Sequence, residues 1–159
     1  MSFICDSPNQ RINEGLLKII ARIANTADQH IVMVATDGNE KHLAISPKES
    51  ARGSSVNGGE LLLAALATCA CNDLFREARK RGMTLADVEV TVEAVFGAEG
   101  DAAENIRYNV RVSGDADPAA LHELVHATDR VTEIQNTVRA ATAVTLARVD
   151  VETTSAMRM

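Results

Sequence analysis

Cysteine is the residue type in this chain best suited to nucleophilic or redox chemistry, and Cys69 is the first candidate. It lies about ten residues into a predicted apolar helix, past the first turn in which a helix dipole lowers a thiol pKa. At helical spacing its neighbours are apolar on one side and include Asp73 and Arg76 on the other. Asp73 opposes thiolate formation, whereas Arg76 favours it. The residues alone leave two interpretations open: a reactive thiol or a small buried hydrophobic side chain.

Cys71 lies about 200° around the same predicted helix from Cys69, so the two thiols point apart. Diverging Cβ vectors on one helix exclude a strain-free disulfide, and the pair forms neither a redox couple nor a metal clamp by itself. We therefore interpret Cys71 as core packing. Cys5 lies in a leading segment, and the sequence assigns it no role.

A second pattern with possible chemistry is His122-Glu-Leu-Val-His126, which matches the zinc-protease pattern His-Glu-x-x-His and places both imidazoles on one helix face. A catalytic zinc site needs a third protein ligand. The acidic residues downstream stand in no recognisable context: Asp129, Glu133, Asp150 and Glu152. Because so short a pattern arises easily by chance, the sequence favours solvated side chains on a surface helix. We expect neither a metal nor a cofactor.

The helix that carries Cys69 is well bounded. Asn57 can cap it, Gly58 and Gly59 permit a tight entry, and Gly82 follows a basic end that suits a helix C-terminus. Apolar residues at helical spacing predict an earlier amphipathic helix at 13–25. Between the two helices, Asp37-Gly38 separates apolar runs at 30–36 and 41–46, which predicts a hairpin, and 47–56 reads as a loop.

The second half of the chain alternates apolar and polar residues in two runs. Residues 88–96 and 106–112 therefore predict two antiparallel strands joined by the 97–104 loop. Asp117 then caps a helix that Pro118 opens and that runs to about 127. A short helix at 132–140 and a last strand at 144–151 complete an α+β fold. We expect one domain over 1–159, with a leading helical segment at 1–29.

Composition narrows the function. Hydrophobic residues make up 46% of the chain, which supports a real core, but aromatic residues make up only 3%, and no ladder of stacking rings exists for bases. The net charge of −6 argues against nucleic-acid and anionic membrane partners. The longest apolar run, 61–71, is too short to span a bilayer, and the N-terminus lacks a signal-peptide pattern. These features predict a cytoplasmic protein with reduced thiols.

Residues 57–69, from Asn-Gly-Gly-Glu-Leu through Leu/Ala-rich turns to Thr-Cys, resemble the central helix of the OsmC/Ohr family. The likeness continues through Arg79-Lys80-Arg81-Gly82 to the final strand and covers roughly residues 30–152. The resemblance implies an α+β fold with antiparallel sheets packed around a long central helix. It also implies an intertwined homodimer with sites at the subunit interface, and reduction of organic hydroperoxides by a cysteine pair.

Carried onto this chain, the resemblance places the peroxide-attacking thiol at Cys69 and implies a low pKa for it. The family's second cysteine falls at Asp129-Arg130-Val131, so this chain resembles a divergent member that lacks it. The family's carboxylate aligns with Gly59, which leaves Glu60 as the nearest substitute. The family's arginine has no counterpart in the first hairpin, which leaves Arg22 and Arg52 as replacements.

Two functions from different classes follow from the resemblance. The first is a thiol-dependent hydroperoxide reductase that uses Cys69 in a one-cysteine mode, with an external thiol or dithiol as reductant. The alternative is a non-enzymatic member that binds a small apolar ligand at the dimer interface, since a binding pocket needs no redox pair.

Overall fold

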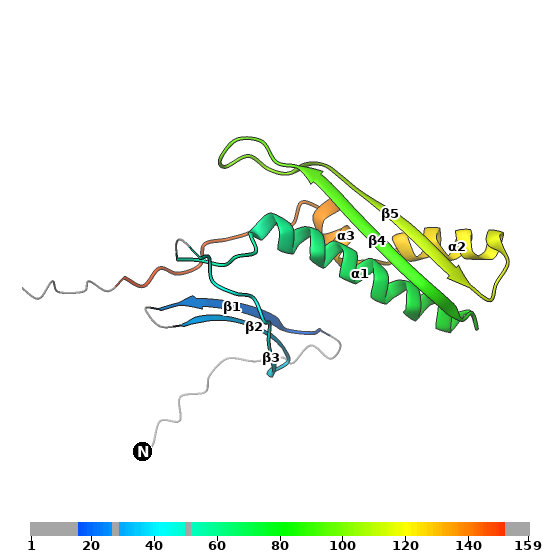
Figure 1. Cartoon of the computed structure of the whole chain (residues 1–159), viewed down its shortest axis with the longest axis horizontal. Helices are drawn as coiled ribbons and strands as arrows, with labels where there is room; N and C mark the ends of the chain where they lie inside the picture. The colour runs from blue at the N-terminus through cyan, green and yellow to red at the C-terminus, as the bar shows by residue number, and fades with distance from the viewer. Residues whose placement is uncertain (1–15, 27–28, 50–51, 152–159) are drawn as a thin grey trace, which may run out of the picture. The chain divides into compact units, whose positions relative to one another are not determined.

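The computed structural model describes residues 16–26, 29–49 and 52–151. Its elements follow the order β1–β2–β3–α1–β4–β5–α2–α3 (Figure 1). The chain divides into two compact units, residues 1–57 and residues 58–159. The first holds β1 to β3, and the second holds the long helix, one β-hairpin and two shorter helices. The fold is α+β with antiparallel sheets, as the sequence predicts.

The first unit is a three-stranded antiparallel sheet of β1 (Ile19–Asn25), β2 (His30–Thr36) and β3 (Asn39–His42), in that order. Asp37 and Gly38 connect β2 to β3 with φ values of 47° and 83°. Two consecutive positive φ values define the tight turn that matches the twist of a hairpin, and Asp and Gly are favoured there. The predicted hairpin is confirmed, with a second strand that is shorter and begins earlier than predicted.

The helix predicted at 13–25 is wrong where the structure describes it, because Ile19–Asn25 form strand β1. Residues 13–15 lie outside the described residues. The isoleucines that suggested a helical stripe are β-branched and suit a strand equally well. Pairing with β2, with Ile23 opposite Val32 and Ile19 opposite Thr36, decides between the two conformations. The spacing of the isoleucines along the sequence does not show that β2 pairs with this segment.

The second unit is organised by α1 (Gly58–Lys80), which confirms the predicted long helix. Leu66, Ala70, Leu74 and Ala78 recur every four residues and form its buried apolar stripe. By length and composition alone α1 could cross a membrane. Within its unit, however, this face packs against β4, α2 and α3, as in the core helix of a globular unit.

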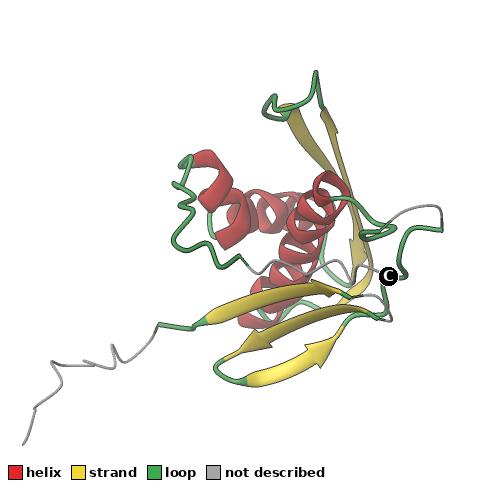
Figure 2. Ribbon diagram, turned by 90° about the vertical axis from the view of Figure 1, so that its left-hand side faces the viewer, coloured by secondary structure: helices red, strands yellow, loops and turns green. Residues whose placement is uncertain are grey.

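Strands β4 (Leu85–Val95) and β5 (Glu104–Gly114) form an antiparallel hairpin, with Val90 opposite Val110. Alternate residues such as Val90 face the helices, while the intervening Glu89 and Arg111 form an ion pair on the exposed face. The three helices of this unit gather on one side of the hairpin (Figure 2). Both predicted strands and their pairing are confirmed.

Two shorter helices complete this unit. α2 (Pro118–Asp129) begins where Asp117 accepts hydrogen bonds from the backbone of Ala119 and Ala120, both at 3.0 Å. α3 (Glu133–Arg139) follows the fully buried Thr132. Both helices confirm the prediction. Leu124 of α2 is completely buried against Leu74 and Ala78 of α1, which closes the core.

The last strand predicted at 144–151 is not formed in the described structure. Residues 143–151 have no regular secondary structure, and the side chains of Val144 and Leu146 are 99% and 84% exposed. A strand needs a neighbour to satisfy its backbone groups, and no described strand pairs with this segment. The alternation of apolar residues indicates an extended conformation for this segment, but it does not show whether another strand lies beside it to pair with.

The buried leucine of α2 gives a test of this core. We expect Leu124→Ala to lower the free energy of unfolding by about 2–5 kcal/mol, because the lost apolar contacts leave a cavity. Urea unfolding followed by circular dichroism measures the change. The matched variant Leu16→Ala removes the same atoms from a side chain that is 73% exposed, and it should change stability by less than about 0.5 kcal/mol. Equal effects would contradict the proposed core.

Candidate functional site

Cys69 lies near the middle of α1, half-buried, where the buried face of the helix meets α3. Its Sγ is 3.6 Å from Oδ2 of Asp73 and 3.9 Å from Oε2 of Glu133. Asp73 is one turn further along α1, while Glu133 is the first residue of α3. The backbone N–H of Ile134 also points at the sulfur. The thiol therefore faces two carboxylates and one helix N-terminus.

Arg76 is the cation of this site. Its Nη1 lies 2.8 Å from Oδ1 of Asp73 and 3.6 Å from Oε1 of Glu133. One guanidinium thus links the two carboxylates that contact the thiol. Asp73 is only 4% exposed, and burying a carboxylate without such a partner would be costly. Arg76 therefore explains why an acidic residue can occupy the buried face of α1 beside the apolar stripe.

A second buried carboxylate, Glu77, extends the charge cluster along α1. Lys80 donates to it at 2.6 Å and Arg81 donates to it at 2.8 Å, and Arg76 lies 3.5 Å away. The hydrogen bonds from Lys80 and Arg81 lower the pKa of Glu77 to about 2. Glu77 is therefore ionised at neutral pH beside three cations, and one of them, Arg76, also contacts the carboxylates of the thiol site.

The surroundings of Cys69 raise the pKa of its thiol above the ordinary value of 9.0. Burial is the main cause, and the negative charges of Asp73 and Glu133 add to it, while the N–H of Ile134 acts in the opposite direction. Burial and Glu133 also raise the pKa of Asp73. The resemblance implies a low thiol pKa, but within this single chain the carboxylates favour the protonated thiol.

The ligand atoms of Cys69, Asp73 and Glu133 lie within 4.8 Å of one another, and among the described residues they form the group that could hold a metal ion. Arg76 already pairs with both carboxylates, so a cation would have to compete with a guanidinium. The rings of His122 and His126 lie 5.2 Å apart on the exposed side of α2. No third ligand joins them among the residues that the structure describes.

The other sequence-predicted site residues lie elsewhere. Glu60 is exposed in the first turn of α1, roughly 13 Å along the axis from Cys69 at the rise of a helix. Arg22 is exposed on β1, and Arg52 is exposed in the loop that follows β3, so both belong to the first unit. Within the second unit, Arg76 is the arginine that the structure brings to the thiol.

Glu133 is the site residue that sequence reasoning missed as a neighbour of Cys69. It is 64 residues away along the chain, and it appeared there only as one of several acidic residues after the histidine pattern. A usable signal was its position directly after Thr132, at the start of a predicted helix, where an acidic side chain is favoured. Nothing local indicated that this helix start would meet α1.

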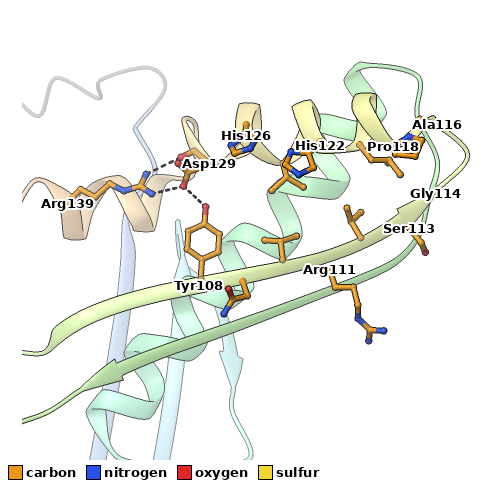
Figure 3. A pocket seen from close by; sticks show the side chains of 15 residues that line it. Tyr108, Arg111, Ser113, Gly114, Ala116, Pro118, His122, His126, Asp129 and Arg139 are labelled. Carbon is orange, nitrogen blue, oxygen red and sulfur yellow. Dashed lines mark hydrogen bonds and ion pairs between the residues drawn. The ribbon is translucent and has the colours of Figure 1, made fainter.

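A groove of about 960 Å³ lies between β5 and α2 (Figure 3). Val110, Val112, Leu121 and Val125 supply its apolar lining. At one end Tyr108 donates its hydroxyl hydrogen bond to Asp129, and Arg139 pairs with the same carboxylate at 2.5 Å. The dashed lines in Figure 3 mark both interactions.

These side chains form the Tyr108–Asp129–Arg139 triad. In this triad, Tyr108 and Arg139 both donate hydrogen bonds to the carboxylate of Asp129. Burial and the neighbouring Asp129 raise the pKa of Tyr108 to about 12. Burial of Asp129 opposes ionisation, but hydrogen bonds from Arg139 and Tyr108 lower the pKa of that carboxyl overall. The position to which the resemblance assigns a second cysteine therefore holds an ionised carboxylate that joins β5 to α2 and α3.

Comparison with known proteins identifies the family of this chain. Residues 51–147, more than half of the chain, match the family model described as OsmC-like protein. The chain belongs to the OsmC-like protein family. Among curated proteins, no match is found.

Solved structures that resemble this chain include an OsmC-like protein and two organic hydroperoxide resistance proteins. An OsmC-like protein from Mycoplasma pneumoniae is 17% identical, covers 79% of this chain and 89% of its own length, and superposes with a TM-score of 0.56. This likeness shows a shared OsmC-like fold. An organic hydroperoxide resistance protein from Legionella pneumophila is 20% identical, with coverage of 77% and 89% and a TM-score of 0.49. The organic hydroperoxide resistance protein of Bacillus subtilis is 20% identical, with coverage of 78% and 90% and a TM-score of 0.44.

The electrostatics of the thiol site can be tested by pH-dependent alkylation. In a Cys5→Ser, Cys71→Ser background, we expect the rate of iodoacetamide reaction at Cys69 to rise with pH and reach half its maximum above pH 9.0, because burial and two carboxylates disfavour the thiolate. Glu133→Gln removes one of those charges and should shift the midpoint to lower pH. The control Glu99→Gln, in the β4–β5 loop, should leave it unchanged. A midpoint near neutrality would contradict this description.

Proposed function

We propose that this OsmC-family protein reduces organic hydroperoxides, with Cys69 as the attacking thiol in a one-cysteine mode. The observation that carries the proposal is the position of Cys69 on the central helix of the family fold, with a buried carboxylate 3.6 Å from its sulfur. Asp73 can accept the thiol proton, and Arg76 at 2.8 Å balances the charge of that carboxylate. The organic hydroperoxide resistance proteins that the chain resembles support the substrate class.

The first chemical step would oxidise the sulfur. The thiol proton passes to Asp73, the thiolate attacks the terminal oxygen of the hydroperoxide, and the O–O bond breaks. The alkoxide that leaves takes the proton back from Asp73, so the products are an alcohol and a Cys69 sulfenic acid. Transferring the proton to Asp73 makes the raised thiol pKa less of an obstacle, because free thiolate need not accumulate before substrate binds.

The second step requires a reductant from outside the chain. Cys71 lies about 200° around α1 from Cys69, and the position of the family's second cysteine holds Asp129. An external thiol would condense with the sulfenic acid to give a mixed disulfide and water. A second thiol, or the other arm of a dithiol, would then release Cys69 and leave with the disulfide. The substrate is reduced by two electrons, and the external thiols supply them.

The proposed working form is a homodimer. Strand β5 pairs with β4 alone among the described strands, and its other edge borders the apolar groove. The extended segment 143–151 carries apolar side chains that are 66–99% exposed. Exposed apolar residues and an available strand edge each favour burial against a second copy. We also propose a cytoplasmic protein without nucleic-acid or membrane partners.

One observation favours a second function. Burial, Asp73 and Glu133 raise the thiol pKa, which is the opposite of the usual activation of a catalytic cysteine. A non-enzymatic member would need no thiolate, and it would use an apolar pocket at the dimer interface to bind a small molecule. The two functions predict different fates for Cys69 in the presence of peroxide.

Turnover with a small organic hydroperoxide separates them. We expect the protein to consume cumene hydroperoxide in the presence of a dithiol, because Cys69 supplies the nucleophile. Cys69→Ser should reduce consumption to that of protein-free buffer, whereas the matched variant Cys71→Ser should retain it. A ferrous oxidation assay for remaining peroxide measures both.

Mass spectrometry after equimolar peroxide without reductant gives the second readout. One added oxygen on Cys69, and none on Cys71, supports the proposed first step. An unoxidised Cys69 together with a copurified small molecule would favour the binding function instead. Unchanged turnover in Cys69→Ser would rule out the catalytic proposal.

The homodimer has its own test. We expect light scattering of the wild-type protein to give twice the mass of one chain, and Leu146→Asp to shift the distribution towards monomer, because a charge replaces an apolar side chain at the proposed contact. The control Thr145→Asp introduces the same charge on the alternate side of the segment. A monomeric wild-type protein would contradict the proposal.

A further inference from the structure

Three side chains that can bind a metal ion meet where α1 and α3 pack together. Cys69 and Asp73 lie one turn apart on α1, and Glu133 is the first residue of α3. Sγ of Cys69 is 3.6 Å from Oδ2 of Asp73 and 3.9 Å from Oε2 of Glu133. One ligand atom from each residue lies within 4.8 Å of the other two. One sulfur and two carboxylate oxygens, supplied by two helices, therefore lie around a common point.

These separations are close to those of a tetrahedral zinc site. Zinc binds a thiolate sulfur at about 2.3 Å and a carboxylate oxygen at about 2.0–2.2 Å, so a sulfur and an oxygen on one ion lie roughly 3.5 Å apart. The sulfur–oxygen distances of 3.6 and 3.9 Å therefore need little adjustment. The side chain of Glu133 is 67% exposed and can turn to bring its oxygen closer.

Arg76 leaves free the oxygens that face the sulfur. Its Nη1 contacts Oδ1 of Asp73 and Oε1 of Glu133, whereas the thiol lies beside Oδ2 and Oε2. Among the described residues, the donor to Oδ2 of the buried Asp73 is the thiol itself, and a thiol is a weak donor. Because buried carboxylates are paired or bind metals, this oxygen points to a missing cation. A metal ion would compete with Arg76 for the charge of the carboxylates, but not for the same oxygen atoms.

The charges at this junction also suit a divalent cation. Asp73 and Glu133 contribute two negative charges, and Arg76 contributes one positive charge. When a divalent metal binds, the thiol proton leaves to solvent and a sulfur–metal bond forms, without electron transfer. The thiolate, the two carboxylates, the guanidinium and the metal ion are then neutral together. Because one ligand is sulfur, the set favours Zn²⁺ over Mg²⁺ and Ca²⁺, which prefer oxygen ligands.

We propose that Cys69, Asp73 and Glu133 bind Zn²⁺, with water as the fourth ligand, and that the bound ion protects the thiol from oxidation. The thiolate is both the metal ligand and the nucleophile, so a sulfur that is bound to zinc is not available to attack a peroxide. The protective role rests on the proposed peroxide chemistry. The metal site itself does not, because coordination requires no peroxide.

Titration with Co²⁺ under nitrogen tests the metal site. Co²⁺ substitutes for Zn²⁺ in tetrahedral sites, and a cobalt–thiolate bond gives a sulfur-to-metal charge-transfer band in the near ultraviolet. In the Cys5→Ser, Cys71→Ser background, Cys69 is the single thiol. We expect the band to saturate at one equivalent of Co²⁺, Zn²⁺ to remove it, and equimolar Mg²⁺ to leave it unchanged.

Two variants assign the ligands. Glu133→Gln removes a carboxylate ligand and should weaken Co²⁺ binding at least about tenfold, because losing even an outer-shell partner of a metal site costs about 10–100-fold in affinity. The control Glu99→Gln, in the β4–β5 loop, should leave the affinity unchanged. The combined His122→Asn, His126→Asn variant should keep the band, because the histidine pair supplies no sulfur.

Two further readouts separate the metal site from the proposed peroxide chemistry. Zn²⁺ should slow the alkylation of Cys69 by iodoacetamide in proportion to the fraction of sites occupied. In mass spectra, it should also prevent the addition of oxygen to Cys69 by cumene hydroperoxide. If Cys69 is not oxidised even without Zn²⁺, the protective role falls together with the proposed function, whereas the cobalt and alkylation results still decide the metal site.

Three results would overturn the metal site. They are a cobalt complex without the charge-transfer band, equal Co²⁺ affinity in Glu133→Gln and the control, and equal alkylation rates with and without Zn²⁺.

Discussion

The packing of one face of α1 against β4, α2 and α3 is the constraint on which the rest of the second unit depends. Leu66, Ala70, Leu74 and Ala78 form a stripe one residue wide, and small side chains at two of these positions let the neighbouring elements approach closely. The stripe fixes the rotation of α1 about its own axis. It thereby determines that Cys69 lies at the edge of the buried face and meets the start of α3.

The same rotation also buries two carboxylates. Asp73 and Glu77 lie one turn apart on the covered side of α1, and each is accepted there only because cations from the next turn reach it. Arg76 contacts both Asp73 and Glu77. How strongly this guanidinium offsets the negative charge near the thiol therefore depends on which of the two carboxylates it contacts more closely. The chemistry of Cys69 is therefore tied to the stability of the helix that carries it, because the same ion pairs support both.

The Tyr108–Asp129–Arg139 triad connects three elements at the other side of the unit. It ties β5 to the end of α2 and the end of α3, at the position where the family resemblance places a second cysteine. A carboxylate there supports structure through hydrogen bonds instead of exchanging electrons. Tyr108 and Arg139 border both the groove and a smaller pocket of about 110 Å³, so the triad contributes to the lining of each.

Much of the local structure could be predicted from the sequence. The long helix, the second hairpin and the cap of α2 by Asp117 follow from periodicity, from turn residues and from a capping side chain, all of which act within a few residues. Strand β1 could not be distinguished from a helix, because isoleucine at this spacing suits both and only pairing with β2 decides. The extended segment 143–151 has the pattern of a strand but lacks a partner in the described chain.

The sequence by itself determined the family, the position of Cys69 on the central helix, and the two neighbours, Asp73 and Arg76, that share its side of α1. Helical geometry is sufficient for these, because i+4 and i+7 residues lie on one face wherever the helix packs. Only the tertiary structure decided that Glu133 meets the thiol across 64 residues and that Gln135 meets Leu66 across 69. Contacts at such separations arise when helices pack, and no local pattern records which helix start will meet which helix face.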